Sequence, residues 1–119
     1  LVLNYFNDMT LDSYQEQAAK TNTYKQNTLG TSGLFMGLSG EAGEATDKAK
    51  KEIRDFEDTA FQDEKRNLKI VHELGDVLWY VSQAAARLGY SLTDIANLNL
   101  IKLQSRAERD KIHGEGDDR

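Results

Sequence analysis

The most regular hydrophobic pattern in the chain begins at Ile70. From there, apolar residues recur three and four positions apart, which places them along one side of an α-helix. They are Ile70, Val71, Leu74, Val77, Leu78, Val81, Ala84, Ala85 and Leu88. Gly89 follows directly, and glycine readily adopts the left-handed conformation that ends helices. The pattern therefore predicts one long amphipathic helix that stops at Gly89.

A weaker pattern of the same kind predicts a second helix from about Leu34 to Arg54. Its apolar and small residues recur at helical spacing, at Leu34, Leu38, Ala42, Ala45, Ala49 and Ile53. Residues 55–62 are charged and lack such periodicity, so we expect them to form the turn between the two long helices.

Two shorter helices complete the expected set. Thr10 can cap a helix that starts at Leu11 and fades within residues 22–28, where Asn and Thr accumulate. Ser91 and Asp94 form a capping box for a last helix, which extends to about Arg106 or Arg109. No proline interrupts any of these segments. The predicted fold class is all-α, a four-helix bundle.

Composition narrows the class of protein further. The 119 residues suit a single domain over the whole length, 1–119. A net charge of −5 argues against a broad surface for nucleic acid. No apolar run approaches the roughly 20 residues that cross a bilayer, so we expect no membrane partner. The absence of cysteine excludes thiolate metal sites and is compatible with a reducing cytoplasm, where we expect the protein.

Four acidic residues form two pairs with equal spacing. Glu41 and Glu44 lie three positions apart on the second predicted helix, and Glu73 and Asp76 repeat that spacing on the third. If the two helices fold back as a hairpin, Glu41 faces Asp76 and Glu44 faces Glu73, because the position numbers of each pair add up to the same value. Both pairs then lie at one height. A single such pair is often only a solvated face.

Carboxylates gathered in this way repel one another unless a cation binds or protons are taken up. Oxygen ligands without histidine or cysteine favour Mg²⁺, with Mn²⁺ as the alternative. We therefore expect Glu41, Glu44, Glu73 and Asp76 to be metal ligands and catalytic residues. One of them, with Glu44 as the first candidate, can instead activate the attacking water.

Some polar and aromatic residues lie away from the apolar side of the third helix. Asp76, Trp79 and Tyr80 are among them, as judged from about 100° of rotation per residue. Either the site lies at the rim of the bundle, or another subunit covers this second surface. We favour the second interpretation, which predicts a homodimer or homotetramer.

Two segments of the chain resemble a known family. Residues 37–45 (GLSGEAGEA) and 73–80 (ELGDVLWY) resemble the MazG-like all-α nucleoside triphosphate pyrophosphatases, which carry an ExxE pair followed by an ExxD pair. Gly40 stands where that family often has a further glutamate. The resemblance implies an all-α domain completed by oligomerisation. It also implies hydrolysis of a nucleoside triphosphate, canonical or modified and possibly a deoxynucleotide, to the monophosphate and pyrophosphate.

The same resemblance extends to residues 99–103 (NLIKL), to Arg106 and to the tail 114–119, which are similar to a phosphate-binding segment of the family. Helical spacing places four possible phosphate ligands on one face: Asn99, Lys102, Arg106 and Arg109. Lys48 and Lys51 either contact phosphate or balance the acids. In the tail, Asp117 and Arg119 are candidates to close over the nucleotide.

Candidates for stacking on the base or hydrogen bonding to it are Tyr14, Gln15, Trp79 and Tyr80. Two other functions compete with this hypothesis. One is hydrolysis of phosphoribosyl-ATP, which the same fold and acidic pairs support, and the other is a non-catalytic helical interaction module. A ferritin-like di-iron site is excluded because it needs Glu-x-x-His, and Lys69 stands three positions before His72.

Overall fold

The structure is a computed structural model, and it describes residues 6–109. The described chain is helical and contains no strand. Its elements are α1 (Leu11–Ala19), α2 (Thr28–Phe56), the 3₁₀ helix η1 (Glu57–Thr59), α3 (Glu64–Arg87) and α4 (Leu92–Glu108). The prediction of an all-α fold with four helices is therefore confirmed.

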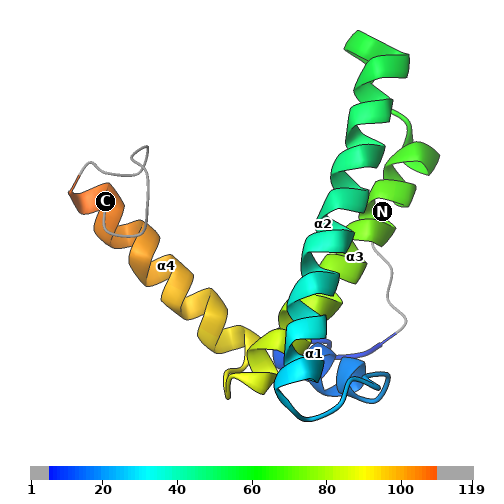
Figure 1. Cartoon of the computed structure of the whole chain (residues 1–119). Helices are drawn as coiled ribbons and strands as arrows, with labels where there is room; N and C mark the ends of the chain where they lie inside the picture. Colours follow the sequence, from blue (N-terminus) through cyan, green and yellow to red (C-terminus); the bar gives the residue numbers. More distant parts are fainter. Residues whose placement is uncertain (1–5, 110–119) are drawn as a thin grey trace.

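Helices α2 and α3 form a long antiparallel hairpin (Figure 1). Helix α1 packs against α3 at the base of this hairpin, near the start of α4. Helix α4 contacts α1 and α3 but not α2 among the described residues, and it diverges from the hairpin towards its C-terminal end. One chain by itself therefore does not close a four-helix bundle, and the prediction was of a bundle completed by oligomerisation.

The predicted start of the second helix was wrong by about two turns. Helix α2 begins at Thr28, because the side chain of Asn27 caps it by accepting a hydrogen bond of 2.8 Å from the backbone N–H of Gly30. The first two turns carry polar residues and glycine, so hydrophobic periodicity gave no signal there. Helix α1 starts at Leu11 as predicted but ends at Ala19, before residues 22–28, and α3 begins at Glu64, ahead of the apolar pattern that starts at Ile70. The end of α3 and the start of α4 agree with the prediction. Gly89 adopts a φ of +84°, and Ser91 and Asp94 form the predicted capping box.

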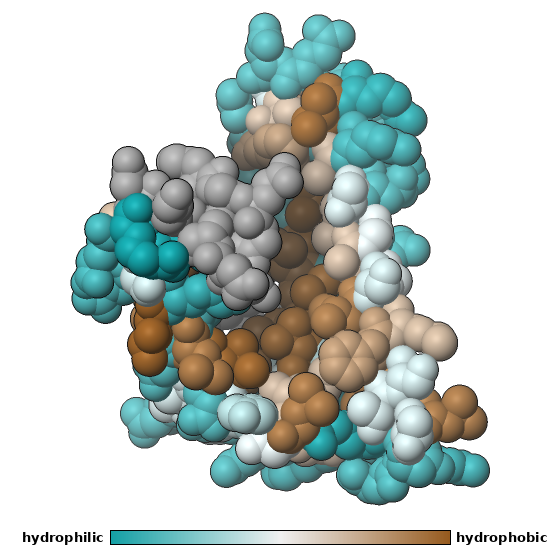
Figure 2. Space-filling view, turned by 60° about the vertical axis from the view of Figure 1, so that its left-hand side comes forward, coloured by the Kyte–Doolittle hydropathy of each residue, from teal (hydrophilic) through white to brown (hydrophobic). Residues whose placement is uncertain are grey.

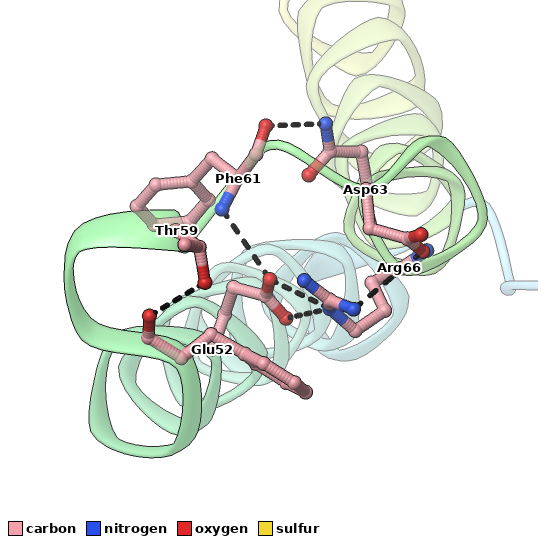
Figure 3. A network of polar contacts seen from close by, with 7 residues as sticks. Glu52, Thr59, Phe61, Asp63 and Arg66 are labelled. Carbon is pink, nitrogen blue, oxygen red and sulfur yellow. Dashed lines mark hydrogen bonds and ion pairs between the residues drawn. The ribbon is translucent and has the colours of Figure 1, made fainter.

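A buried ion pair fixes how α2 and α3 meet at the turn (Figure 3). The carboxylate of Glu52, only 6% exposed, accepts hydrogen bonds of 2.8 and 3.1 Å from Nε of Arg66. It also accepts one from the backbone N–H of Phe61, and the Arg66 guanidinium stacks on the ring of Phe56 at 3.5 Å. Asp63 caps the start of α3. These contacts tie α2, the turn and α3 together.

A polar network joins the helices at the base. The side-chain amide of Gln15 donates to the backbone carbonyl oxygens of Ser82, at 2.8 Å, and of Tyr90, at 3.2 Å, while its oxygen accepts from the backbone N–H of Leu92. The buried amide of Gln83 donates to the carbonyl oxygen of Gln15. Gln15, a candidate for contacting a nucleotide base, uses its side-chain amide to hold α1, α3 and α4 together.

The apolar side of α3 is largely exposed within one chain. Val71 and Leu74 are each 53% exposed, and on α4 Leu98 and Ile101 are 55% and 64% exposed. Apolar side chains gather on the face between the hairpin and α4 (Figure 2). The buried apolar residues are instead few and mostly small: Ala18, Leu34, Ala45, Ala84, Ala85 and Leu92. The pattern that predicted α3 thus describes a surface that this chain covers only in part, since Val71 and Leu74 are exposed whereas Ala84 and Ala85 are buried.

None of the helices in residues 6–109 is both long enough and apolar enough to cross a membrane.

Glu52→Ala should destabilise the hairpin, because it leaves the Arg66 guanidinium and the Phe61 N–H without their acceptor. We expect the free energy of unfolding to fall by about 1–3 kcal/mol, the cost of an unsatisfied and partly buried polar group. Chemical denaturation followed by circular dichroism measures this. Arg54→Ala is the matched control, since Arg54 and Asp55 form an exposed pair whose loss should change stability little. Equal losses in the two variants would contradict this role for Glu52.

Candidate active site

Three of the four predicted acids come together in the groove of the hairpin. One carboxylate oxygen each of Glu41 on α2 and of Glu73 and Asp76 on α3 lie within 4.8 Å of one another. Glu41 and Glu73 are half-buried and Asp76 is exposed. The antiparallel pairing of α2 and α3 thus places the acids at one height, as the spacing predicted. We call these three residues the acidic cluster.

The protonation behaviour of the cluster reflects the repulsion between its members. The pKa of Glu41 is raised above its ordinary value, first by burial and next by the negative charge of Asp76. The pKa of Glu73 is lowered, chiefly because its carboxylate accepts a hydrogen bond of 2.5 Å from the ammonium group of Lys48. The surroundings of Glu41 and Glu73 therefore shift the pKa values of these two carboxyl groups in opposite directions.

Glu44 lies beside the cluster rather than within it. It is exposed, and its oxygen atoms are not among those within 4.8 Å. Its charge still reaches the cluster, since it contributes to the raised pKa of both Glu41 and Lys48. Lys48 balances the acids, which was one of its two expected roles, while Lys51 pairs with Asp47 at 2.7 Å.

An aromatic wall borders the cluster on the side of α1. Thr21, Glu41, Asp76, Trp79 and Tyr80 line a cleft of about 310 Å³, which we call the aromatic cleft. The rings of Trp79 and Tyr80 meet edge to face with centroids 4.8 Å apart. The cleft places two aromatic rings beside the acids, and the face of such a ring can stack on a nucleotide base.

The segment before α2 supports this wall and was missed by sequence reasoning. The hydroxyl groups of Tyr24 and Tyr80 lie 3.0 Å apart, and Nε1 of Trp79 donates to the Thr21 hydroxyl at 2.8 Å. The hydrogen bond with Tyr24, followed by burial, raises the pKa of Tyr80 to about 12. Trp79 and Tyr80 are therefore held by the chain's own segment. Both remain half-buried within one chain, and the covering of this surface by another subunit stays a prediction.

Glycine at two positions makes room for these tyrosines. A Cβ atom on Gly37 would lie 2.1 Å from Cε1 of Tyr80, and one on Gly33 would lie 2.7 Å from the same atom of Tyr24. The i, i+4 spacing of these glycines was the available signal that something approaches α2 closely. A Cβ on Gly40, Gly43 or Gly75 would meet no described atom within 4 Å, so these three do not serve packing within the described chain.

The remaining candidate substrate ligands do not all lie near the acidic cluster. Tyr14 is half-buried, and its pKa is raised by burial and then by Asp76, so it lies near the cluster. Asn99 and Arg109 are exposed on α4, Lys102 is half-buried and Arg106 is buried. Because α4 does not contact α2, one chain does not bring this helix against Glu41. His72 is exposed on α3, and Asp117 and Arg119 lie outside the described residues.

Comparison with known proteins supports the interpretation of this groove. The family model of the MazG nucleotide pyrophosphohydrolase domain matches residues 30–109, which include both acidic pairs. The chain belongs to the MazG family. It is also 42% identical over 116 residues to the Gene 37 protein of Mycobacterium phage L5, covering 93% of this chain and all of that protein. The search of solved structures found no match.

Within this MazG domain, Gly37→Ala should displace Tyr80 and disturb the aromatic cleft. Alanine favours a helix by roughly 1 kcal/mol over glycine, so a fall in stability would come from the clash with Tyr80. Trp79 is the single tryptophan of the chain, and it lies against Tyr80, so its fluorescence reports the change directly. We expect a shifted emission spectrum and a fall in stability, because a Cβ atom 2.1 Å from Cε1 of Tyr80 forces that ring to move.

Gly43→Ala is that control, since its new methyl group meets no described atom. It should leave the emission of Trp79 unchanged and stabilise the protein by up to about 1 kcal/mol. Identical spectra for both variants would contradict the role of Gly37.

Proposed function

We propose that the protein is a magnesium-dependent hydrolase that converts a nucleoside triphosphate to the monophosphate and pyrophosphate. The observation that carries this proposal is the convergence of Glu41, Glu73 and Asp76 from the two helices that bear the family's acidic pairs. A phosphoanhydride substrate fits such a site because its negative charge requires a cation shared with protein carboxylates.

The residues present suit a divalent cation of this kind. The cluster offers oxygen ligands from three side chains within 4.8 Å of one another, and the exposed Glu44 beside them is available as a fourth ligand or as the base. Magnesium, or manganese in its place, prefers carboxylate oxygens and keeps some of its waters. When bound, such a cation neutralises phosphate charge and lowers the pKa of a coordinated water.

The chain's own side chains would perform the remaining tasks. The rings of Trp79 and Tyr80 offer a surface on which a base can stack, with the Tyr80 ring held in place by Tyr24. Glu44, exposed beside the cluster, can accept a proton from the attacking water if it is not a ligand.

We further propose that the active protein is a homodimer or homotetramer. The apolar side of α3 and the apolar residues of α4 stay exposed in one chain, and exposed apolar surface of this extent typically marks a protein interface. A second copy that covered them would also bring α4 close to the acidic cluster of a neighbouring chain. The candidate phosphate ligands on this helix and at its end are Asn99, Lys102, Arg106 and Arg109.

Substrate profiling tests the proposed reaction. The full chain would be incubated with Mg²⁺ and a panel of canonical and modified nucleoside triphosphates, with phosphoribosyl-ATP included, and pyrophosphate release would be measured. Release from a nucleoside triphosphate supports the proposal. Release from phosphoribosyl-ATP alone would assign the alternative substrate, and no release from any compound would favour the interaction module.

Glu41→Gln and Asp76→Asn should abolish the response to magnesium. In the unaltered protein, Mg²⁺ at ten times its Kd should stabilise the fold by about 1.4 kcal/mol, seen as a rise in Tm. The variants should lose this rise together with roughly 10²-fold or more of the activity, since even partners behind a metal ligand are worth roughly 10–100-fold. Their metal-free Tm should not fall, because each change removes repulsion between carboxylates.

Asp58→Asn controls for the loss of one negative charge, because Asp58 is exposed in η1 at the turn. It should keep both the magnesium response and the activity. A full magnesium response in Glu41→Gln would refute the metal site.

Leu74→Lys should disrupt the assembly. Placing a charge on the exposed apolar side of α3 opposes burial of that surface against a second copy. We expect a dimer or tetramer for the unaltered protein in analytical ultracentrifugation and a smaller species for the variant. Leu11→Lys, at an exposed apolar position at the start of α1, is the control and should leave the mass unchanged. A monomeric unaltered protein would refute the proposed assembly.

A further inference from the structure

One lysine of α2 reaches the acidic cluster. Lys48 stands seven positions after Glu41 and four after Glu44, so these three side chains share one face of the helix. Its ammonium group crosses to α3 and donates a hydrogen bond of 2.5 Å to Oε1 of Glu73. The chain therefore supplies a positive charge of its own at the place where its two acidic pairs meet.

The pair of Lys48 with Glu73 is better shielded from solvent than a surface pair. The side chain of Glu73 is 16% exposed and that of Lys48 is 37% exposed, whereas the paired Lys51 and Asp47 are 53% and 41% exposed. The hydrogen bond with Glu73 raises the pKa of Lys48, and the negative charge of Glu44 adds to this effect. Lys48 thus stays positively charged beside the acids, where salt screens it less than an exposed lysine.

Lys48 and a divalent cation compete for the same carboxylate. Glu73 offers one of the three oxygen ligands of the acidic cluster, and it is also the acceptor for Lys48. When an ion binds, the ammonium group either leaves Glu73 or stays beside the ion. If it leaves, a charge-assisted hydrogen bond is lost. If it stays, two cations repel each other across one carboxylate. Both cases oppose binding of the ion.

We propose that Lys48 is the resident counter-ion of the acidic cluster, which holds Glu73 in the ion-free protein and lowers the affinity of the cluster for a divalent cation. This rests on the proposed function, because it concerns the same metal site. Without an ion, the ammonium group offsets part of the repulsion among the acids and so stabilises the fold. With an ion, the same positive charge opposes binding. Lys48 thereby sets the ion concentration at which the site fills.

Binding of Mn²⁺ to the full chain, with no nucleotide present, tests this role. Isothermal titration calorimetry would compare the unaltered protein with Lys48→Met and Lys48→Arg. We expect Lys48→Met to bind Mn²⁺ about tenfold more tightly, because the ion no longer has to break a charge-assisted hydrogen bond. Lys48→Arg keeps the positive charge, so it should bind Mn²⁺ like the unaltered protein.

Thermal unfolding of the same proteins gives a second readout. The ion-free Tm of Lys48→Met should lie below that of the unaltered protein, because the acidic cluster has lost its counter-ion. The rise in Tm at a fixed concentration of Mn²⁺ should nevertheless be larger in this variant, since tighter binding stabilises the fold more. A lysine that only packed α2 against α3 would lower the Tm equally with and without the ion.

Lys51→Met is the matched control. It removes the same charge from α2 together with an ion pair, that of Lys51 with Asp47 at 2.7 Å. Because both side chains are exposed, salt screens their charges and the pair contributes little. This variant should therefore bind Mn²⁺ like the unaltered protein. Circular dichroism would establish that all the variants are folded.

The outcomes separate this inference from the proposed function. Unchanged or weaker Mn²⁺ binding in Lys48→Met, or an equal gain in Lys48→Met and Lys51→Met, would overturn the role of Lys48 and leave the proposed reaction standing. Selectively tighter binding in Lys48→Met, without nucleotide hydrolysis by the unaltered protein, would support the role of Lys48 and refute the proposed reaction. No Mn²⁺ binding by any of these proteins would overturn both.

Discussion

The register between α2 and α3 determines nearly every feature of the groove. The ion pair of Glu52 with Arg66 anchors this register beside the turn, where it also binds the backbone of Phe61. Two antiparallel helices keep the register set at their connection along their whole length, because each residue advances both by the same rise. A slip of one residue would rotate the acids of α2 away from those of α3. The acidic cluster therefore depends on contacts located two or more turns away.

The cluster itself is electrostatically unfavourable without a cation. Carboxylates that share so small a space repel one another, and the pKa of Glu41 is raised by burial first and then by the charge of Asp76. Lys48 relieves part of it by binding Glu73. Functional sites often keep groups whose pKa values are perturbed in this way, because a ligand then binds where the protein alone leaves charge uncompensated. The rings of Trp79 and Tyr80 stand beside the cluster and add an aromatic surface to the charged one.

The chain as a whole buries few large apolar side chains. A small core of mostly alanine, reinforced by the Gln15 network at the base, holds the helices together. The larger apolar residues of α3 and α4 remain on the surface (Figure 2). A chain of this length has limited apolar surface to bury on its own, so a shared core is a physically reasonable solution.

The sequence by itself determined the helical class, the starts of α1 and α4 and the equal spacing of the acids, since these depend on local periodicity and capping. It also carried the family resemblance that the comparison with known proteins bears out. Only the tertiary structure decided that Gln15 braces the base, that Tyr24 holds Tyr80 and that Glu44 stands outside the cluster. It alone revealed that the apolar side of α3 is covered only in part. These features arise from contacts between residues distant in the chain, and such contacts leave no periodic signal in the sequence.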